Sequence, residues 1–224
     1  MTGRRRIYLM RHAAVKYFEG LPPEEVRLTH EGRRQAEAAK DALRDIHFDR
    51  VVTSGLPRTL TTAEIVAPGL EHEIHPDLRE IESGEIRGLD PEEVQAMMTT
   101  AFRGVVPLDA RFLGGETIAS LLDRVLPAVD ALLADASWDV VLLVLHGGVN
   151  RAILSRAITG ERTFLGGFEQ TPGCINVLDV DAGGAFVVRG VNFTAYDPAH
   201  VHASRLTTME QLWGEYLDAR SRVP

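Results

Sequence analysis

The chain has 224 residues, of which 45% are hydrophobic and 25% charged, so it can build a hydrophobic core and is not intrinsically disordered. This length suits one domain, and we expect residues 1–224 to form a single one. The formal net charge of −8 argues against a general nucleic-acid binder, whose affinity depends on lysine and arginine meeting phosphates. A small anionic substrate is still compatible with this charge, because a local cluster of arginines can act inside an acidic protein.

Cysteine content and apolar runs indicate the compartment. Cys174 is the only cysteine, so no intrachain disulfide can form; we expect a reducing compartment and a buried Cys174. The apolar run Ile7–Met10 is too short for a signal peptide, and Val140–Leu145 is too short to span a bilayer. We therefore predict a soluble, cytoplasmic protein with no membrane partner.

Strand-like and helix-like segments alternate along the chain. The first half is predicted to contain, in order, a strand at Ile7–Arg11, a helix at Thr29–Arg44, a strand at Arg50–Thr53, a helix opened by Pro57 and a helix at Pro91–Phe102. The second half is predicted to contain a helix at Glu116–Ala134, a strand at Val140–Leu145, a helix at Val149–Ile158, strands at Ile175–Val180 and Ala185–Val191, and a final helix at Leu206–Leu217. We expect Thr29 to cap its helix, Pro127 to bend another, and Asp181–Gly184 to form a hairpin turn.

This alternation predicts an α/β fold, a three-layer α/β/α sandwich on a mostly parallel sheet. Val140–Leu145 is continuously apolar, as a strand buried on both faces should be. In such sheets the ligand lies beyond the carboxyl ends of the strands. The polar residues that follow each strand are therefore the first candidates for a site.

Arginine and histidine follow three of the predicted strands. The first strand ends at Arg11 and His12, the second leads to Arg58, and the central strand is followed by His146. Together they would form a pocket for a dianion with a nucleophile in it, because the planar arginine side chain makes paired hydrogen bonds with phosphate. The turn at Gly147 opens a helix, whose free backbone N–H groups also favour an anion.

Six segments carry a more specific pattern. They are Arg11-His12-Ala13, Leu28–Ala36, Thr53–Thr59, Leu78–Gly84, Gly114–Thr117 and Leu145–Gly148. In this order they resemble the motifs of the histidine phosphatase superfamily, also called phosphoglycerate mutase-like, from Ile7 to about Val191. The resemblance implies the phosphoglycerate mutase-like fold and a phosphatase that works through a phosphorylated histidine.

The resemblance assigns a role to each strand-end residue. It makes His12 the nucleophile that attacks phosphorus. His12 must be neutral to attack, and Arg11 and Arg58 would help, because nearby positive charge disfavours the imidazolium form. His146 would donate to the phosphoryl oxygens, and with the two arginines and Gly147 it would bind the phosphate.

The resemblance also implies a general acid. Glu80 holds the family's position for the group that protonates the leaving alcohol and then deprotonates the attacking water. Glu82 and Glu85 are close competitors that the sequence separates poorly. We expect no metal and no cofactor: His200 and His202 lack a matching carboxylate or cysteine spacing, and the chain has neither a Walker-type phosphate loop nor a dinucleotide fingerprint.

Two positions depart from the family pattern. Ala13 stands where the family has glycine, and we expect little effect because alanine is also small. Phe18 stands where family mutases have an asparagine, so one phosphate-binding side chain is missing or is replaced by Lys16 or Tyr17.

Two other functions stay open beside the phosphatase. A cofactor-dependent phosphoglycerate mutase would return the phosphoryl group to its substrate, but the segment before Gly114 offers only Arg103 and Arg111 where family mutases have a basic insertion. A non-catalytic member would bind a phosphorylated ligand without turnover, although all the reacting groups are present. We favour a phosphatase for a small phosphorylated metabolite, with specificity set around Lys16–Pro23 and Arg87–Arg111; neither the substrate nor the oligomeric state can be read from the sequence.

Overall fold

The computed structural model describes residues 3–86 and 88–222, so Arg87, at the start of the second specificity segment, lies outside the described residues. The strands are β1 (Arg5–Arg11), β2 (Arg50–Thr53), β3 (His72–Ile74), β4 (Val140–Leu145), β5 (Ile175–Val180) and β6 (Phe186–Phe193). The helices are α1 (His30–Leu43), α2 (Pro57–Val66), α3 (Pro91–Thr100), α4 (Ile118–Ala134), α5 (Gly147–Thr159) and α6 (Thr208–Ser221), with short 3₁₀ turns η1 (Pro76–Leu78) and η2 (Phe112–Gly114).

The strands of the described chain form one sheet in the order β3-β2-β4-β1-β5-β6. Strands β3, β2, β4 and β1 are parallel to one another, β5 is antiparallel to β1, and β6 is antiparallel to β5. One strand of this sheet therefore runs against the rest, which confirms the predicted mostly parallel sheet. The β5–β6 hairpin at Asp181–Gly184 is also confirmed.

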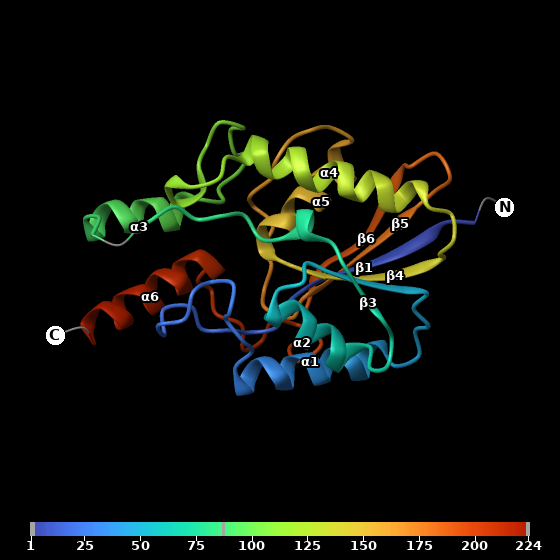
Figure 1. Cartoon of the computed structure of the whole chain (residues 1–224), viewed down its shortest axis with the longest axis horizontal. Coiled ribbons are helices and arrows are strands. Elements are labelled where there is room, and N and C mark those ends of the chain that lie inside the picture. The colour runs from blue at the N-terminus through green and yellow to red at the C-terminus, as the bar shows by residue number, and fades with distance from the viewer. Residues whose placement is uncertain (1–2, 87, 223–224) are drawn as a thin grey trace.

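Helices cover both faces of the sheet, as Figure 1 shows, with α4 and α5 on one side and α1 and α2 on the other. The strands supply alternate side chains to the two layers, as the two-residue period of a strand requires. In β1, Ile7 and Leu9 join the core under α4 and α5, whereas Tyr8 and Met10 join the core over α1 and α2. The three-layer α/β/α sandwich is therefore the observed architecture.

A third hydrophobic cluster lies away from the sheet. Helices α3 and α6 extend side by side beyond the strand ends (Figure 1), where Val94, Met98 and Tyr216 of these helices cluster with Leu113 of η2. The segment after β1 contributes Phe18, whose ring meets Tyr216 edge to face with 5.5 Å between centroids. This cluster stands next to the carboxyl ends of the parallel strands, where the ligand is expected.

Local sequence explains most element boundaries. Thr29 caps α1 as predicted, because its hydroxyl accepts a hydrogen bond from the Gly32 N–H at 3.0 Å. A Cβ on Gly32 would collide with the Ala14 carbonyl, so glycine lets α1 pack directly against the loop that follows His12. Helix α4 begins two residues later than predicted and continues through Pro127.

Helix α5 and strand β3 also differ from the sequence prediction. Helix α5 begins at Gly147 rather than Val149, with His146 as its N-cap, so both glycines are helical. Strand β3 was not predicted, because its three residues are too few to show a periodic pattern.

Two further expectations can be compared with the structure. Cys174 is buried, as predicted, and burial raises the pKa of its thiol to about 12. Among the described residues, no helix is both long and apolar enough to cross a bilayer.

Candidate active site

Three neighbouring strands end at the same edge of the sheet. Strand β4 lies between β2 and β1, with Arg11 opposite Leu145 and Thr53 opposite Val144. The next residues along these strands are His12, His146 and Ser54, so the register places all three together. Each is nearly inaccessible to solvent.

His12 has a defined tautomer. Its Nδ1 lies 2.8 Å from the Ala13 carbonyl oxygen, which can only accept, so Nδ1 carries the proton. The Nε2 atom is therefore unprotonated, and it has no hydrogen-bond partner among the described residues although it is buried. Burial, and then the positive charges of Arg58 and Arg11, hold the pKa of His12 well below its usual value of 6.5. The result is a neutral imidazole with a free lone pair at Nε2.

His146 lies against His12, with 5.3 Å between the ring centroids and 64° between the ring planes. Its Nε2 is hydrogen-bonded to Ser54 Oγ at 2.8 Å, which fixes the orientation of the ring. Burial first, and then the charge of Arg58, lower the pKa of His146 well below its usual value. Its Nδ1 is buried without a partner in the described part of the chain, so one ring nitrogen is available for a ligand.

Arg11 and Arg58 are buried beside His12, and each is anchored by one bond to a backbone carbonyl. Arg58 Nη1 donates to the Pro23 oxygen at 2.6 Å, and Arg11 Nη1 donates to the Gln170 oxygen. The Nε atom of each guanidinium is buried with no partner among the described residues. Buried donors are normally satisfied, so these unpaired N–H groups mark a place where an anion would be bound.

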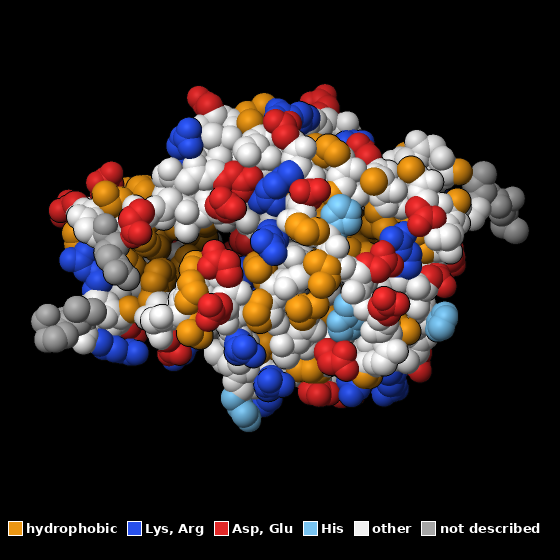
Figure 2. Space-filling view, in the orientation of Figure 1, with side chains coloured by type: hydrophobic (Ala, Val, Ile, Leu, Met, Phe, Trp, Pro, Cys, Tyr) orange, Lys and Arg blue, Asp and Glu red, His pale blue; other side chains and the backbone are white. Residues whose placement is uncertain are grey.

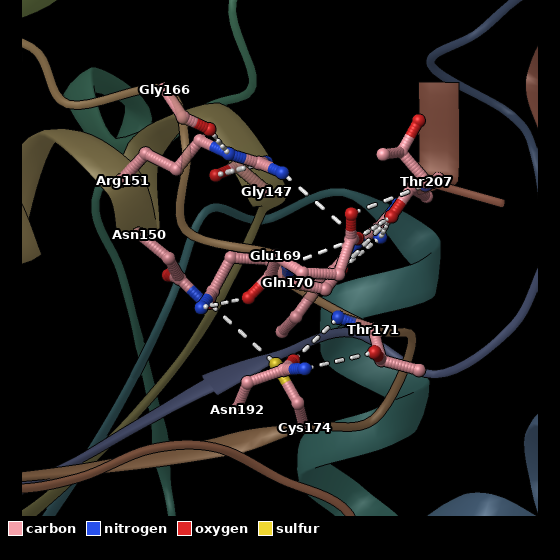
Figure 3. Close-up of polar contacts among 12 residues, drawn as sticks. Gly147, Asn150, Arg151, Gly166, Glu169, Gln170, Thr171, Cys174, Asn192 and Thr207 are labelled. Atoms are coloured by element: carbon pink, nitrogen blue, oxygen red, sulfur yellow. Dashed lines mark hydrogen bonds and ion pairs between the residues drawn. The ribbon is translucent and has the colours of Figure 1, made fainter. Parts of the chain in front are cut away.

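A buried amide network holds the residue that anchors Arg11. The Gln170 side-chain oxygen accepts from Asn150 Nδ2 at 3.0 Å (Figure 3) and from Asn176 Nδ2 at 2.9 Å. Gln170 Nε2 donates to Asn176 Oδ1 at 3.0 Å. Asn176 in turn donates to the Leu9 carbonyl in β1 at 2.8 Å. Gln170, whose backbone carbonyl binds Arg11, is therefore connected to strand β1 through Asn176.

Glu80 contacts the first turn of α5, the helix that His146 caps. Its Oε1 accepts from the Gly148 N–H at 2.9 Å, so the first turn of α5 holds the carboxylate two residues from His146. A Cβ on Gly148 would lie 2.7 Å from that oxygen, which explains why glycine suits this position. Glu80 is half-buried, whereas Glu82 and Glu85 are exposed.

Arg124 holds the Glu80 loop from the opposite side. From α4, it donates to the carbonyls of Asp77 and Arg79, both at 2.7 Å, and of Glu80 at 3.2 Å. Glu116 keeps the guanidinium in place through two bonds of 2.9 and 2.8 Å. The Leu78–Gly84 and Gly114–Thr117 segments, separate in sequence, thus form one structure that positions Glu80.

Most of the candidate site residues line one cleft of about 2020 Å³. Its lining includes Arg11, His12, Arg58, Glu80 and Gly147, and the ring of His146 contacts that of His12. A model of the histidine phosphatase superfamily (branch 1) matches residues 7–194. The chain belongs to the histidine phosphatase superfamily.

Relatives within this family include both phosphatases and mutases. An Arabidopsis thaliana protein named probable 2-carboxy-D-arabinitol-1-phosphatase is 33% identical over 156 residues, which are 68% of this chain and 32% of that protein. This chain thus matches about a third of that relative's length. The adenosylcobalamin/alpha-ribazole phosphatase of Salmonella typhimurium is 29% identical over 192 residues, covering 80% of this chain and 92% of that one. A probable phosphoglycerate mutase of Salmonella paratyphi A is 32% identical over 153 residues, 63% of this chain and 69% of that one.

Solved structures agree with the fold. A mycobacterial glucosyl-3-phosphoglycerate phosphatase superposes with a TM-score of 0.69 at 25% identity, covering 84% of this chain and 99% of that one. Together with the named phosphatases among the relatives, this supports a phosphoric monoester hydrolase.

The structure shows the surroundings of Phe18, which stands where family mutases have an asparagine. Phe18 turns its ring to Tyr216 of α6 rather than carrying a polar group to the phosphate. Tyr17 lines the cleft, and the Arg58 guanidinium carbon lies 5.8 Å from the centre of its ring. Lys16 is exposed and pairs with Glu19 at 3.5 Å. Of the two replacements considered, Tyr17 is the one that meets a phosphate-binding candidate.

Sequence reasoning missed three residues at this site. Ser54 follows β2 and could have been found as a polar residue at a strand end. Arg151 lies one helical turn after Gly147, and its Nη1 donates to the Gly147 carbonyl at 3.2 Å while Nε donates to Gly166 (Figure 3). Burial lowers the pKa of Arg151 to about 10. Arg124 could not be recognised from the sequence, because the carbonyls it binds lie in a loop more than forty residues away.

Proposed function

We propose that this protein is a phosphatase that hydrolyses a phosphomonoester through a phosphohistidine intermediate on His12. The observation that carries the proposal is the buried, unpartnered Nε2 of His12, fixed in its unprotonated form by the Ala13 carbonyl. A lone pair in this setting is a preformed nucleophile. The phosphatase relatives support the same reaction class.

In the first step the His12 Nε2 lone pair attacks phosphorus, and the bond between phosphorus and the ester oxygen breaks. Glu80, in its protonated form, gives its proton to the leaving oxygen, so the products are an alcohol and phosphorylated His12. The Nδ1 proton stays on His12 throughout, donated in a hydrogen bond to the Ala13 carbonyl oxygen.

In the second step a water molecule attacks the same phosphorus. The Glu80 carboxylate accepts a proton from this water, and the phosphorus–nitrogen bond breaks. Inorganic phosphate leaves, while His12 returns to its neutral form and Glu80 to its protonated form. One glutamate can serve both steps because the leaving alcohol and the incoming water occupy the same side of the phosphorus.

The remaining groups stabilise the phosphoryl oxygens. Unpaired Nε–H groups of Arg11 and Arg58 and a free ring nitrogen of His146 surround the nucleophile. Donors fixed in advance around developing charge supply most of the catalysis of phosphoryl transfer. The two arginines supply the positive charge that a metal would otherwise bring.

Trapping the intermediate tests the proposal. We expect ³²P-labelled substrate to label the protein on His12, with a label stable in alkali and rapidly lost in acid, as for a phosphorus–nitrogen bond. His12→Ala should lose essentially all turnover and labelling, whereas His30→Ala, a change of the exposed first residue of α1, should retain both. Mass spectrometry that locates the phosphoryl group on another residue would contradict the proposal.

A further inference from the structure

The catalytic cleft continues well beyond the phosphate-binding end. At about 2020 Å³ it exceeds the roughly 300–1,000 Å³ of an ordinary small-ligand site. Figure 2 shows the molecule hollowed between the regions of α3 and α6, with hydrophobic side chains on the wall. This extension lies where the alcohol part of a bound ester would project when its phosphate meets His12.

The wall of this extension is apolar. Phe18, Leu89, Met209, Leu212 and Tyr216 line the cleft, and all belong to the cluster that joins α3 to α6. We call these five residues the apolar wall. Four of them are only half-buried, and Tyr216 alone is fully buried. The wall therefore presents hydrophobic surface to the cleft, and an apolar ligand would remove that surface from water.

The charges around the extension disfavour a second anion. Beyond Arg11, Arg58 and Arg151, the described lining contains only Arg79 and Arg220 as arginines and no lysine. Arg220 is turned back on its own helix, with Nη1 3.3 Å from the hydroxyl of Tyr216.

Carboxylates are more numerous in the same lining. They include Glu24, Glu31, Glu82 and Glu215. The backbone N–H of Tyr17 donates to a carboxylate oxygen of Glu215 at 3.4 Å. A carboxylate or second phosphate on the substrate would meet like charge here.

We propose that the preferred substrate is the phosphate ester of a bulky, apolar alcohol that carries no carboxylate and no second phosphate. This inference rests on the proposed phosphatase reaction and names its substrate class. The reacting phosphate meets Arg11, Arg58 and His12, and the apolar wall receives the alcohol. A phosphoglycerate places its carboxylate against an apolar and acidic surface, so it is a poor substrate.

Three esters of primary alcohols test the class with the same reacting bond. They are 2-(2-naphthyl)ethyl phosphate, ethyl phosphate and 3-phosphoglycerate. We expect kcat/KM for the naphthylethyl ester to exceed that for each of the others by at least about tenfold, the discrimination typical of a hydrophobic pocket. Equal or higher kcat/KM for 3-phosphoglycerate overturns the inference.

A matched pair of variants on α6 locates the contact. Leu212 belongs to the apolar wall, whereas Leu217 is 43% exposed and is not among the cleft-lining residues. We expect Leu212→Asn to lower the ratio of kcat/KM for naphthylethyl phosphate to that for ethyl phosphate by about tenfold, and Leu217→Asn to leave the ratio unchanged. An unchanged ratio in both variants contradicts the proposed position of the alcohol.

The outcomes separate the two proposals. If no ester is hydrolysed and no phosphohistidine forms, the phosphatase reaction itself is rejected, and this inference with it. If all three esters are hydrolysed through phosphorylated His12 without preference for the naphthylethyl ester, the reaction stands and the substrate class is wrong.

Discussion

The Glu80 carboxylate accepts a hydrogen bond from the Gly148 N–H, with 2.9 Å between Oε1 and N. The proposed general acid is thereby held by the first turn of the helix that His146 caps. We predict that Glu80→Gln slows phosphorylation of His12 by alkyl phosphates on the order of 10²–10⁴-fold, because their leaving oxygen needs a proton. The effect on p-nitrophenyl phosphate should be much smaller, since its leaving group needs little protonation. The measurement is kcat/KM or single-turnover phosphorylation, because kcat can report the second step.

Glu82→Gln and Glu85→Gln are the matched controls, since both side chains are exposed in the same loop. Each variant should keep the wild-type ratio of kcat/KM for alkyl phosphates to kcat/KM for p-nitrophenyl phosphate. A leaving-group-dependent loss at Glu82 or Glu85, with Glu80→Gln near wild type, would mean that the wrong glutamate has been assigned.

Arg124 is predicted to act on the reaction through the position of Glu80. Arg124→Met removes the bonds to the carbonyls of Asp77, Arg79 and Glu80. We expect kcat/KM for an alkyl phosphate to fall about tenfold or more, with a smaller loss for p-nitrophenyl phosphate. Lysine should not restore activity, because one ammonium cannot replace the planar set of donors.

The control for Arg124 is Arg162→Met. This change removes an exposed arginine that pairs with Asp123, the neighbour of Arg124 in α4. This change should leave both substrates unaffected. Equal losses for both substrates in Arg124→Met would indicate a general structural role and would reject positioning of the acid.

The two buried histidines should remain neutral at pH values where ordinary histidines become charged. Burial and the arginines lower the pKa of His12, so its neutral form persists below pH 6.5. We predict no titration of the His12 and His146 rings near pH 6.5 by NMR. Arg58→Met removes one of the causes and should raise both pKa values toward 6.5. A His12 ring that titrates at its ordinary pKa in the wild type contradicts this account.

Activity is predicted to be independent of a metal ion. Arg11 and Arg58 are buried beside His12 and are proposed to bring positive charge to the phosphate. Within residues 3–86 and 88–222, no group of three or more metal-binding side chains is arranged to hold an ion. We expect full hydrolysis of p-nitrophenyl phosphate after treatment with EDTA. Loss of activity that magnesium or zinc restores would disprove the prediction.

Local patterns in the sequence determined much of the fold. The continuous apolar run Val140–Leu145 is the central strand β4, and Thr29 caps α1 as its position predicted. Such features depend on side-chain period and on hydrogen bonds between close neighbours, so a short segment contains the information. The motifs after β1, β2 and β4 also placed His12, Arg58 and His146 at one edge, because parallel strands end together.

Only the tertiary structure decided how these groups work. The hydrogen bond from Gly148 to Glu80 joins residues 68 apart, and the contact between Ser54 and His146 joins residues 92 apart. The apolar wall brings Phe18, near one end of the chain, against α6 at the other. These contacts depend on the paths of loops and on packing between helices, which no periodic pattern within one segment specifies. The sequence by itself therefore determined most of the helices and strands and the candidate reacting residues, whereas the support of Glu80, the anchoring of the arginines and the shape of the cleft were decided by long-range packing.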